Sequence, residues 1–136
     1  MEVESLVLNH IALVVEDLRE ALAFWGEKVG LPVAGAAETI ADEGVDIAFL
    51  QLGDARLELI QPRDQASGVA RYLAKRGAGL HHLCLEVPSL DAKLGELAAQ
   101  GIELINEAPR ERDGRRYAFV HPASTGGVLL ELYERR

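Results

Sequence analysis

The chain has 136 residues, of which 22 are acidic and 14 basic, and its formal net charge is −8. This length suits one compact domain, and the acidity argues against sequence-independent binding to nucleic acid or to an anionic membrane surface. The single cysteine, Cys84, excludes a disulfide within the chain, and no apolar run is long enough to span a membrane. We therefore expect a cytoplasmic protein without nucleic-acid or membrane partners, in which Cys84 is a small buried side chain.

The first half of the chain predicts a β-α-β-β-β unit. Asp17, with Glu20 three residues later, is typical of a helix start, and Gly30 and Pro32 end the helix. Apolar residues and turn signals predict strands over 6–15, near 31–34, and over 45–50 and 56–60.

The second half predicts the same order of elements after a short linking helix from Ser67 to Gly77. A helix begins at Ser89, which follows Asp17 by 72 positions, and ends at Gly101. Strands are expected over 80–87, around 103–105, and over 116–120 and 128–133. We expect one domain over 1–136, with module one at about 6–62, the linking helix at about 67–77 and module two at about 79–134.

One histidine and one glutamate recur in both halves. His82 follows His10 by 72 positions, and Glu131 follows Glu58 by 73. If the halves pack about a pseudo-twofold axis, these four side chains converge on one point. Two imidazoles and two carboxylates around one point form a divalent-metal site. The fold class expected is therefore α+β, with two tandem β-α-β-β-β modules that form a curved mixed sheet around a metal site.

Strand alternation supports this interpretation. Leu57 and Leu59 can pack under a helix while Glu58 projects from the other face. In the same way Ile11 points to the helix-covered face and its neighbour His10 to the uncovered face. The alternative is that each Glu is the solvent-facing member of an amphipathic strand, and that each His is only hydrogen-bonded. The matching offsets in both halves favour the metal site. This ligand set suits Co²⁺, which we expect first, or Mn²⁺, Ni²⁺ or Zn²⁺.

Other polar residues have two interpretations each. His81 points to the face opposite to His82 and is expected to be structural. His121, before Pro122, contacts substrate or shapes a turn. A cluster of basic residues with few apolar neighbours is typical of a solvated loop, but beside a metal pocket such a cluster could also hold phosphates. This cluster consists of Arg110, Arg112, Arg115 and Arg116, with Lys75 or Arg76 as further candidates.

Three motifs resemble those of the vicinal oxygen chelate superfamily, and most closely its methylmalonyl-CoA epimerase branch. They are NHIA at 9–12, GAGLHH at 77–82 and AFVHPASTGGVLLEL at 118–132, and the likeness covers nearly the whole chain. The resemblance implies a metal-dependent isomerase that interconverts the C2 epimers of methylmalonyl-CoA by proton transfer through a metal-stabilised enediolate. It also implies an acyl-CoA substrate and a homodimer.

Carried over to this sequence, the resemblance makes His10, Glu58, His82 and Glu131 the metal ligands. Some epimerases have Gln at the second ligand position, where this chain has Glu58. Some also have a catalytic Glu where Ile47 stands, so the expected bases are Glu131 first and Glu58 or Asp46 second. The expected substrate contacts are Arg115, Arg116, His121, Ser124 and Thr125.

Three other functions share this fold. A glyoxalase-I-type lyase or isomerase uses the same metal set, but the 124–127 segment favours the epimerase. A non-enzymatic drug-resistance protein that binds a small molecule would generally lack the full ligand set. A ring-cleaving dioxygenase would have a longer chain and three protein ligands.

Overall fold

The computed structural model describes residues 6–136, so the first five residues of the domain expected over 1–136 lie outside it. Within this range the chain forms two compact units. One consists of residues 10–81, and the other of residues 82–136 with the start of the first strand up to Asn9. That both units form one domain stays a prediction. Among the described residues, each helix is too short or too polar to cross a lipid bilayer.

The unit of residues 10–81 contains a mixed sheet in the order β2-β3-β4-β1. Its strands are β1 (Val7–Val14), β2 (Glu38–Ile40), β3 (Val45–Leu52) and β4 (Ala55–Pro62). β1 and β4 are parallel, with Ala12 beside Glu58, and the other neighbours are antiparallel. The predicted strands over 6–15, 45–50 and 56–60 are confirmed, with small shifts of their ends.

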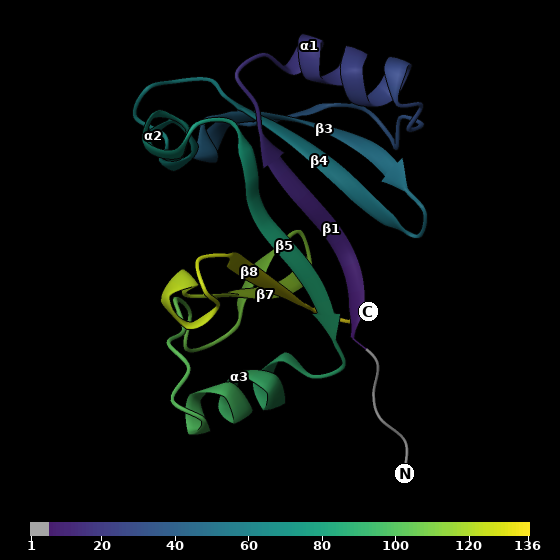
Figure 1. Cartoon of the computed structure of the whole chain (residues 1–136). Helices are drawn as coiled ribbons and strands as arrows, with labels where there is room; N and C mark the ends of the chain where they lie inside the picture. The colour runs from purple at the N-terminus through teal and green to yellow at the C-terminus, as the bar shows by residue number, and fades with distance from the viewer. Residues whose placement is uncertain (1–5) are drawn as a thin grey trace. The chain divides into compact units, whose positions relative to one another are not determined.

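One face of this sheet is covered by α1 (Leu18–Leu22), which continues as a π-helical segment, η1 (Ala23–Lys28) (Figure 1). Leu57 and Leu59 are buried on this face, and the partly buried Ile11, Leu22 and Trp25 pack against them. Full burial of one large aliphatic side chain stabilises the fold by about 1.5–3 kcal/mol. The predicted face assignment of Leu57, Leu59 and Ile11 is therefore confirmed.

The predicted linking helix is α2 (Gly68–Arg76), with Ser67 as its N-cap. The Ser67 hydroxyl accepts a hydrogen bond from the N–H of Ala70. Tyr72 of this helix packs edge to face against His81, with the ring centroids 4.7 Å apart. This contact agrees with a structural role for His81.

The unit of residues 82–136 repeats the architecture in the order β5-β8-β7-β6. Its elements are β5 (Gly79–Val87), α3 (Leu90–Ala99), β6 (Arg110–Arg112), β7 (Arg115–Val120), the 3₁₀ turn η3 (Pro122–Ser124) and β8 (Leu129–Glu134). α3 packs against β7 and β8 (Figure 1). The core between them contains Leu90, Leu94 and Leu132. The predicted order of strand, helix and three strands is confirmed in both units.

Both sheet helices have the same start. Asp17 accepts a hydrogen bond from the N–H of Glu20, and Ser89 accepts one from Ala92. A second acceptor comes from the last strand of each unit: Gln61 for the N–H of Leu18 and Glu134 for that of Leu90. Two of the N–H groups that a helix start leaves unsatisfied are thus bonded in each case.

The two short strands differ from the prediction. The segments near 31–34 and 103–105 form only isolated bridges, Val33 to Leu50 and Leu104 to Val120. The short strands are instead β2 and β6, seven residues further on, and they still differ by 72 positions. Pro32 has no N–H to donate, and in the second unit the side chain of Asn106 takes the N–H of Phe119. The missing donor in the first unit and the side-chain acceptor in the second each interrupt a regular backbone ladder.

The arginine-rich segment expected as a solvated loop is a hairpin of β6 and β7. The antiparallel register joins Arg112 to Arg115 across a tight turn at Asp113 and Gly114. Both turn residues have positive φ, 52° and 75°, as a two-residue hairpin turn of type I′ requires. A strand gives neighbouring arginines opposite faces, which a flexible loop does not.

Candidate metal and substrate site

His10 on β1 and Glu58 on β4 form the first candidate ligand pair. Nδ1 of His10 lies 3.3 Å from Oε2 of Glu58, and the two side chains are only 2% and 14% exposed. Across the antiparallel β3–β4 ladder, Phe49 is the direct neighbour of Glu58. An apolar ring therefore flanks a carboxylate that is mostly shielded from water. A buried carboxylate needs a positive or hydrogen-bonding partner, and this one has an imidazole at hand.

His82 on β5 and Glu131 on β8 form the second pair, within the other unit. Nε2 of His82 lies 3.2 Å from Oε1 of Glu131, and the side chains are 9% and 8% exposed. Phe119 is the direct antiparallel neighbour of Glu131, and its ring lies edge to face with that of His82, the centroids 6.0 Å apart. Each unit therefore holds a His–Glu contact that is buried or mostly buried, beside a phenylalanine.

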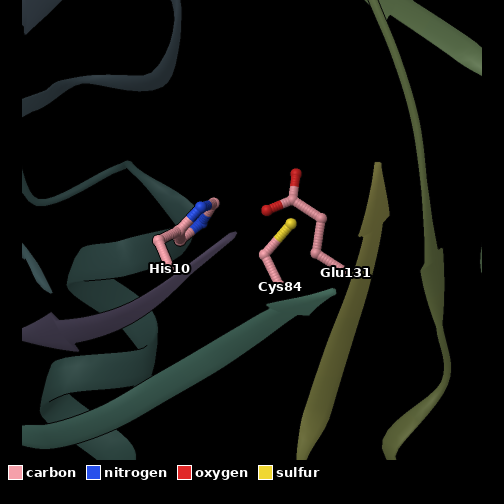
Figure 2. Close-up of side chains that lie close together, drawn as sticks. All are labelled: His10, Cys84 and Glu131. Carbon is pink, nitrogen blue, oxygen red and sulfur yellow. The ribbon is translucent and has the colours of Figure 1, made fainter. Parts of the chain in front are cut away.

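Cys84 lies next to Glu131. The parallel register of β5 and β8 pairs these two residues, and Figure 2 shows their side chains on the same side of neighbouring strands. Sγ of Cys84 and a carboxylate oxygen of Glu131 lie within 4.8 Å of each other. Cys84 is fully buried and free of any disulfide, as the sequence predicts. Its sulfur adds a soft donor to the surroundings of Glu131.

Asp46 does not lie with these residues. Glu58 pairs directly with Phe49 across β3–β4, and residues three apart on a strand point to opposite faces, so Asp46 is on the other face of the sheet. There its carboxylate accepts a hydrogen bond from the Thr39 hydroxyl. The structure thus separates Asp46 from the face of Glu58, and its role as a base stays a prediction. Ile47 is on the face of Glu58 and carries no proton acceptor.

Arg115 and Arg116 are neighbours on β7 and therefore lie on opposite faces of the sheet, and their predicted substrate contacts stay predictions. Arg116 bonds to both carboxylate oxygens of Glu134 and to Asp91 of α3. The bonds to Asp91 and Glu134 raise the pKa of Arg116 above its usual value. The hydrogen bond from Leu90, followed by that from Arg116, lowers the pKa of Glu134. Arg116 is therefore committed to holding β7, β8 and α3 together.

The polar side chains of the loop after β7 bond to backbone groups of the loop itself and of Glu103. Nδ1 of His121 accepts a hydrogen bond from the N–H of Ala123, so His121 caps η3. The Ser124 hydroxyl accepts the N–H of Glu103, and the Thr125 hydroxyl donates to the carbonyl of Pro122. Turn formation is therefore the observed role of His121, and the predicted substrate contacts of His121, Ser124 and Thr125 stay predictions.

Sequence reasoning missed three residues around Arg115. The register of β5, β8 and β7 puts Glu86, Tyr133 and Tyr117 in one row on the face of Glu131. The guanidinium carbon of Arg115 lies 4.5 Å above the centroid of the Tyr133 ring, and Nη2 is 3.8 Å from Oε2 of Glu86. Alternation from His82 predicts the face of Glu86, but nothing in the sequence predicts its neighbours.

The fold and the paired histidines and glutamates define a class of protein. A family model described as the glyoxalase/bleomycin resistance protein/dioxygenase superfamily matches residues 9–119. The chain belongs to this superfamily, as its sequence motifs predict.

Particular relatives are more specific. The uncharacterized protein YqjC of Bacillus subtilis is 38% identical over 93% of this chain and 91% of its own length. The mitochondrial methylmalonyl-CoA epimerase of Homo sapiens is 36% identical over 92% of this chain and 72% of its own. The crystal structure of methylmalonyl-CoA epimerase from Mycobacterium tuberculosis has a TM-score of 0.85 at 35% identity, covering 100% of this chain and 93% of that one.

Proposed function

We propose that this protein is a methylmalonyl-CoA epimerase, an isomerase that exchanges the proton at C2 of methylmalonyl-CoA. We also propose that His10, Glu58, His82 and Glu131 together hold one divalent metal ion. The observation that carries the proposal is the buried His–Glu contact, which recurs at matching positions in both units. Its support is the similarity to methylmalonyl-CoA epimerases over nine-tenths of the chain.

The chemistry of the donor set fits a divalent transition metal. Two imidazoles and two carboxylates are ligands that would hold Co²⁺, Mn²⁺, Ni²⁺ or Zn²⁺. Co²⁺ stays our first candidate, and the sulfur of Cys84 beside Glu131 favours borderline ions such as Co²⁺, Ni²⁺ and Zn²⁺ over the hard Mg²⁺. When bound, the ion supplies positive charge that stabilises the negative charge developing on the substrate oxygens.

Proton transfer falls to carboxylates of the chain. The C2 proton of methylmalonyl-CoA lies between a thioester and a carboxylate, which makes it acidic enough for a carboxylate base. Epimerisation needs proton exchange on both faces of the planar intermediate, so one acid-base group is required on each face. Glu131 is the first base and Glu58 the second. Asp46 is left out because it lies on the other face of the sheet from Glu58.

Binding of the CoA portion involves exposed basic side chains. Arg110 and Arg112 are exposed on β6, at the edge of the sheet of residues 82–136, and can reach phosphates in solvent. Lys75 and Arg76 at the end of α2 are further candidates, and the loop residues His121, Ser124 and Thr125 are proposed to line the substrate path. We also propose that the protein is a cytoplasmic homodimer. Light scattering measures its mass in solution and thereby tests the dimer.

The test combines two measurements on the purified protein. Elemental analysis after dialysis against Co²⁺ and removal of free ions is expected to find one metal per chain. In D₂O, one C2 epimer of methylmalonyl-CoA is then expected to gain deuterium at C2 while the other epimer forms. Metal-dependent conversion of a glutathione hemithioacetal without this exchange would instead support the glyoxalase-I-type alternative.

A further inference from the structure

Arg115 occupies an unusual position for a surface-strand arginine. Its side chain is only 18% exposed, and it lies on the same face of the sheet as His82 and Glu131. The guanidinium carbon lies over the ring of Tyr133, 4.5 Å from its centroid. Stacking on an aromatic ring fixes the plane of a guanidinium group without using its hydrogen-bond donors.

The donors of Arg115 are not matched by the nearest carboxylate. Nε is buried and has no hydrogen-bond partner among residues 6–136. The nearest carboxylate oxygen, Oε2 of Glu86, is 3.8 Å from Nη2, which is beyond hydrogen-bond distance. That same oxygen accepts a hydrogen bond of 2.9 Å from the side-chain amide of Asn9. Glu86 therefore balances the charge of Arg115 at a distance while it is held by Asn9.

The position of Arg115 relative to Glu131 follows from the register. Tyr133 and Glu131 are successive residues on one face of β8, and such residues are about 7 Å apart along a strand. A group seated against Arg115 is thus one such step from the proposed base. In methylmalonyl-CoA the carboxylate is bonded to C2 itself, whereas the phosphates of CoA lie at the far end of a long pantetheine arm.

We propose that Arg115, held by Tyr133, binds the free carboxylate of the substrate and thereby selects 2-carboxyacyl thioesters over simple acyl thioesters. This inference rests on the proposed function and assigns a specificity residue within it. A planar guanidinium fork matches the two oxygens of a carboxylate and gives a charge-assisted contact. Phosphate groups offer the same anionic oxygens, so the experiment must separate the two sources.

Methylmalonyl-CoA and propionyl-CoA form a matched pair, because they differ only in the carboxylate at C2. Calorimetric titration of the Co²⁺-loaded protein gives the dissociation constant of each ligand. The ratio used below is the dissociation constant of propionyl-CoA divided by that of methylmalonyl-CoA. In Arg115→Met the affinity for methylmalonyl-CoA is expected to fall about 10-fold or more, while that for propionyl-CoA changes little. Arg115→Lys, which keeps the charge without the planar fork, is expected to lie between the wild type and Arg115→Met.

Two further variants sharpen the test. Arg116→Met removes the neighbouring arginine, which lies on the opposite face and bonds Glu134 and Asp91, and is expected to leave the ratio unchanged. Glu86→Gln removes the negative charge that competes for Arg115, and is expected to tighten methylmalonyl-CoA relative to propionyl-CoA. A purely structural Arg115 would not respond to Glu86→Gln in this way.

Each other outcome overturns the assignment. An equal loss for both ligands in Arg115→Met and Arg115→Lys would assign Arg115 to the CoA portion, and no loss for either would exclude it from the site. A smaller ratio in Glu86→Gln would contradict the charge competition. Deuterium exchange into methylmalonyl-CoA by the wild-type protein separates failure of this inference from failure of the proposed function. If the wild type shows no exchange, the proposed function fails. If it does exchange, an unchanged ratio in Arg115→Met contradicts only the role of Arg115.

Discussion

The carboxylate of Glu134, at the end of β8, accepts a hydrogen bond of 3.1 Å from the N–H of Leu90, the first residue of α3. Arg116 bonds the same carboxylate through Nη1 at 3.0 Å. Glu134 thus joins the start of the helix to two strands of the sheet it covers. In the unit of residues 10–81 the amide of Gln61 accepts the N–H of Leu18 in the same way, but it carries no charge.

Glu134→Gln is expected to lower the free energy of unfolding at pH 7, with a pH dependence of known sign. The pKa of Glu134 is lowered in the folded protein from an ordinary value of 4.5, so its ionised form stabilises the fold. That contribution is complete above this ordinary value and is lost as the pH falls through the lowered pKa. Urea denaturation at pH 7 and pH 3 measures the difference between wild type and variant, which is expected to shrink on acidification.

Gln61→Ala is the matched control for this effect. It removes the equivalent acceptor from Leu18 but no charge, so its destabilisation is expected to be similar at both pH values. A Glu134→Gln protein that is equally destabilised at pH 7 and pH 3 would contradict a role for the charge.

His82→Ala is expected to reduce bound metal strongly, because it removes one of two imidazoles from the proposed ligand set. His81→Ala serves as the control, since His81 packs against Tyr72 and is not part of that set. Elemental analysis of both variants after the same Co²⁺ loading measures the effect. Equal metal content in the two proteins would refute the assignment of His82.

Glu131→Gln tests whether Glu131 is a base as well as a ligand. Glutamine keeps an oxygen donor but loses the ability to accept a proton, so metal content is expected to survive in good part. Turnover is expected to fall by about 10²-fold or more, the usual scale for a lost general base. Metal analysis and the rate of epimerisation measure the two effects on the same sample.

Comparison with Glu58→Gln extends this test. Loss of a base on one face is expected to make deuterium exchange depend on which epimer is supplied, with opposite preferences for the two variants. A Glu131→Gln enzyme that binds metal and turns over at the wild-type rate would leave Glu131 as a ligand only, and would assign the proton transfer to Glu58.

Leu59→Ala is expected to destabilise the unit of residues 10–81 by about 2–5 kcal/mol, the range measured for deletion of buried leucine atoms. Leu59 is fully buried among the side chains that pack under α1. Val33→Ala is the exposed control, because Val33 is 69% exposed and its loss should cost within about 0.5 kcal/mol. Urea denaturation measures both, and comparable losses would contradict the packing of this core.

The sequence by itself determined the repeated element order and which face each strand residue occupies. Strand alternation and helix caps act over a few residues, so His10 and Glu58 are readable as members of the uncovered face, and Asp17 and Ser89 as helix starts. The two caps are 72 positions apart, so the repeat predicts the same helix start in the second half. Asp46 is readable in the same way, because alternation with the buried Ala48 and Leu50 puts it on the helix-covered face, away from Glu58.

Only the tertiary structure decided which residues meet across strands. Leu18 and Gln61 are 43 residues apart in sequence, and Glu86 comes close to Arg115 only because β5 and β7 both flank β8. The short strands, too, lie where antiparallel partners in β3 and β7 accept them, at 38–40 and 110–112. Alternation predicts the face on which a side chain lies, but it does not predict the register between strands that are distant in sequence. Register depends on the packing of whole sheets and on turn geometry.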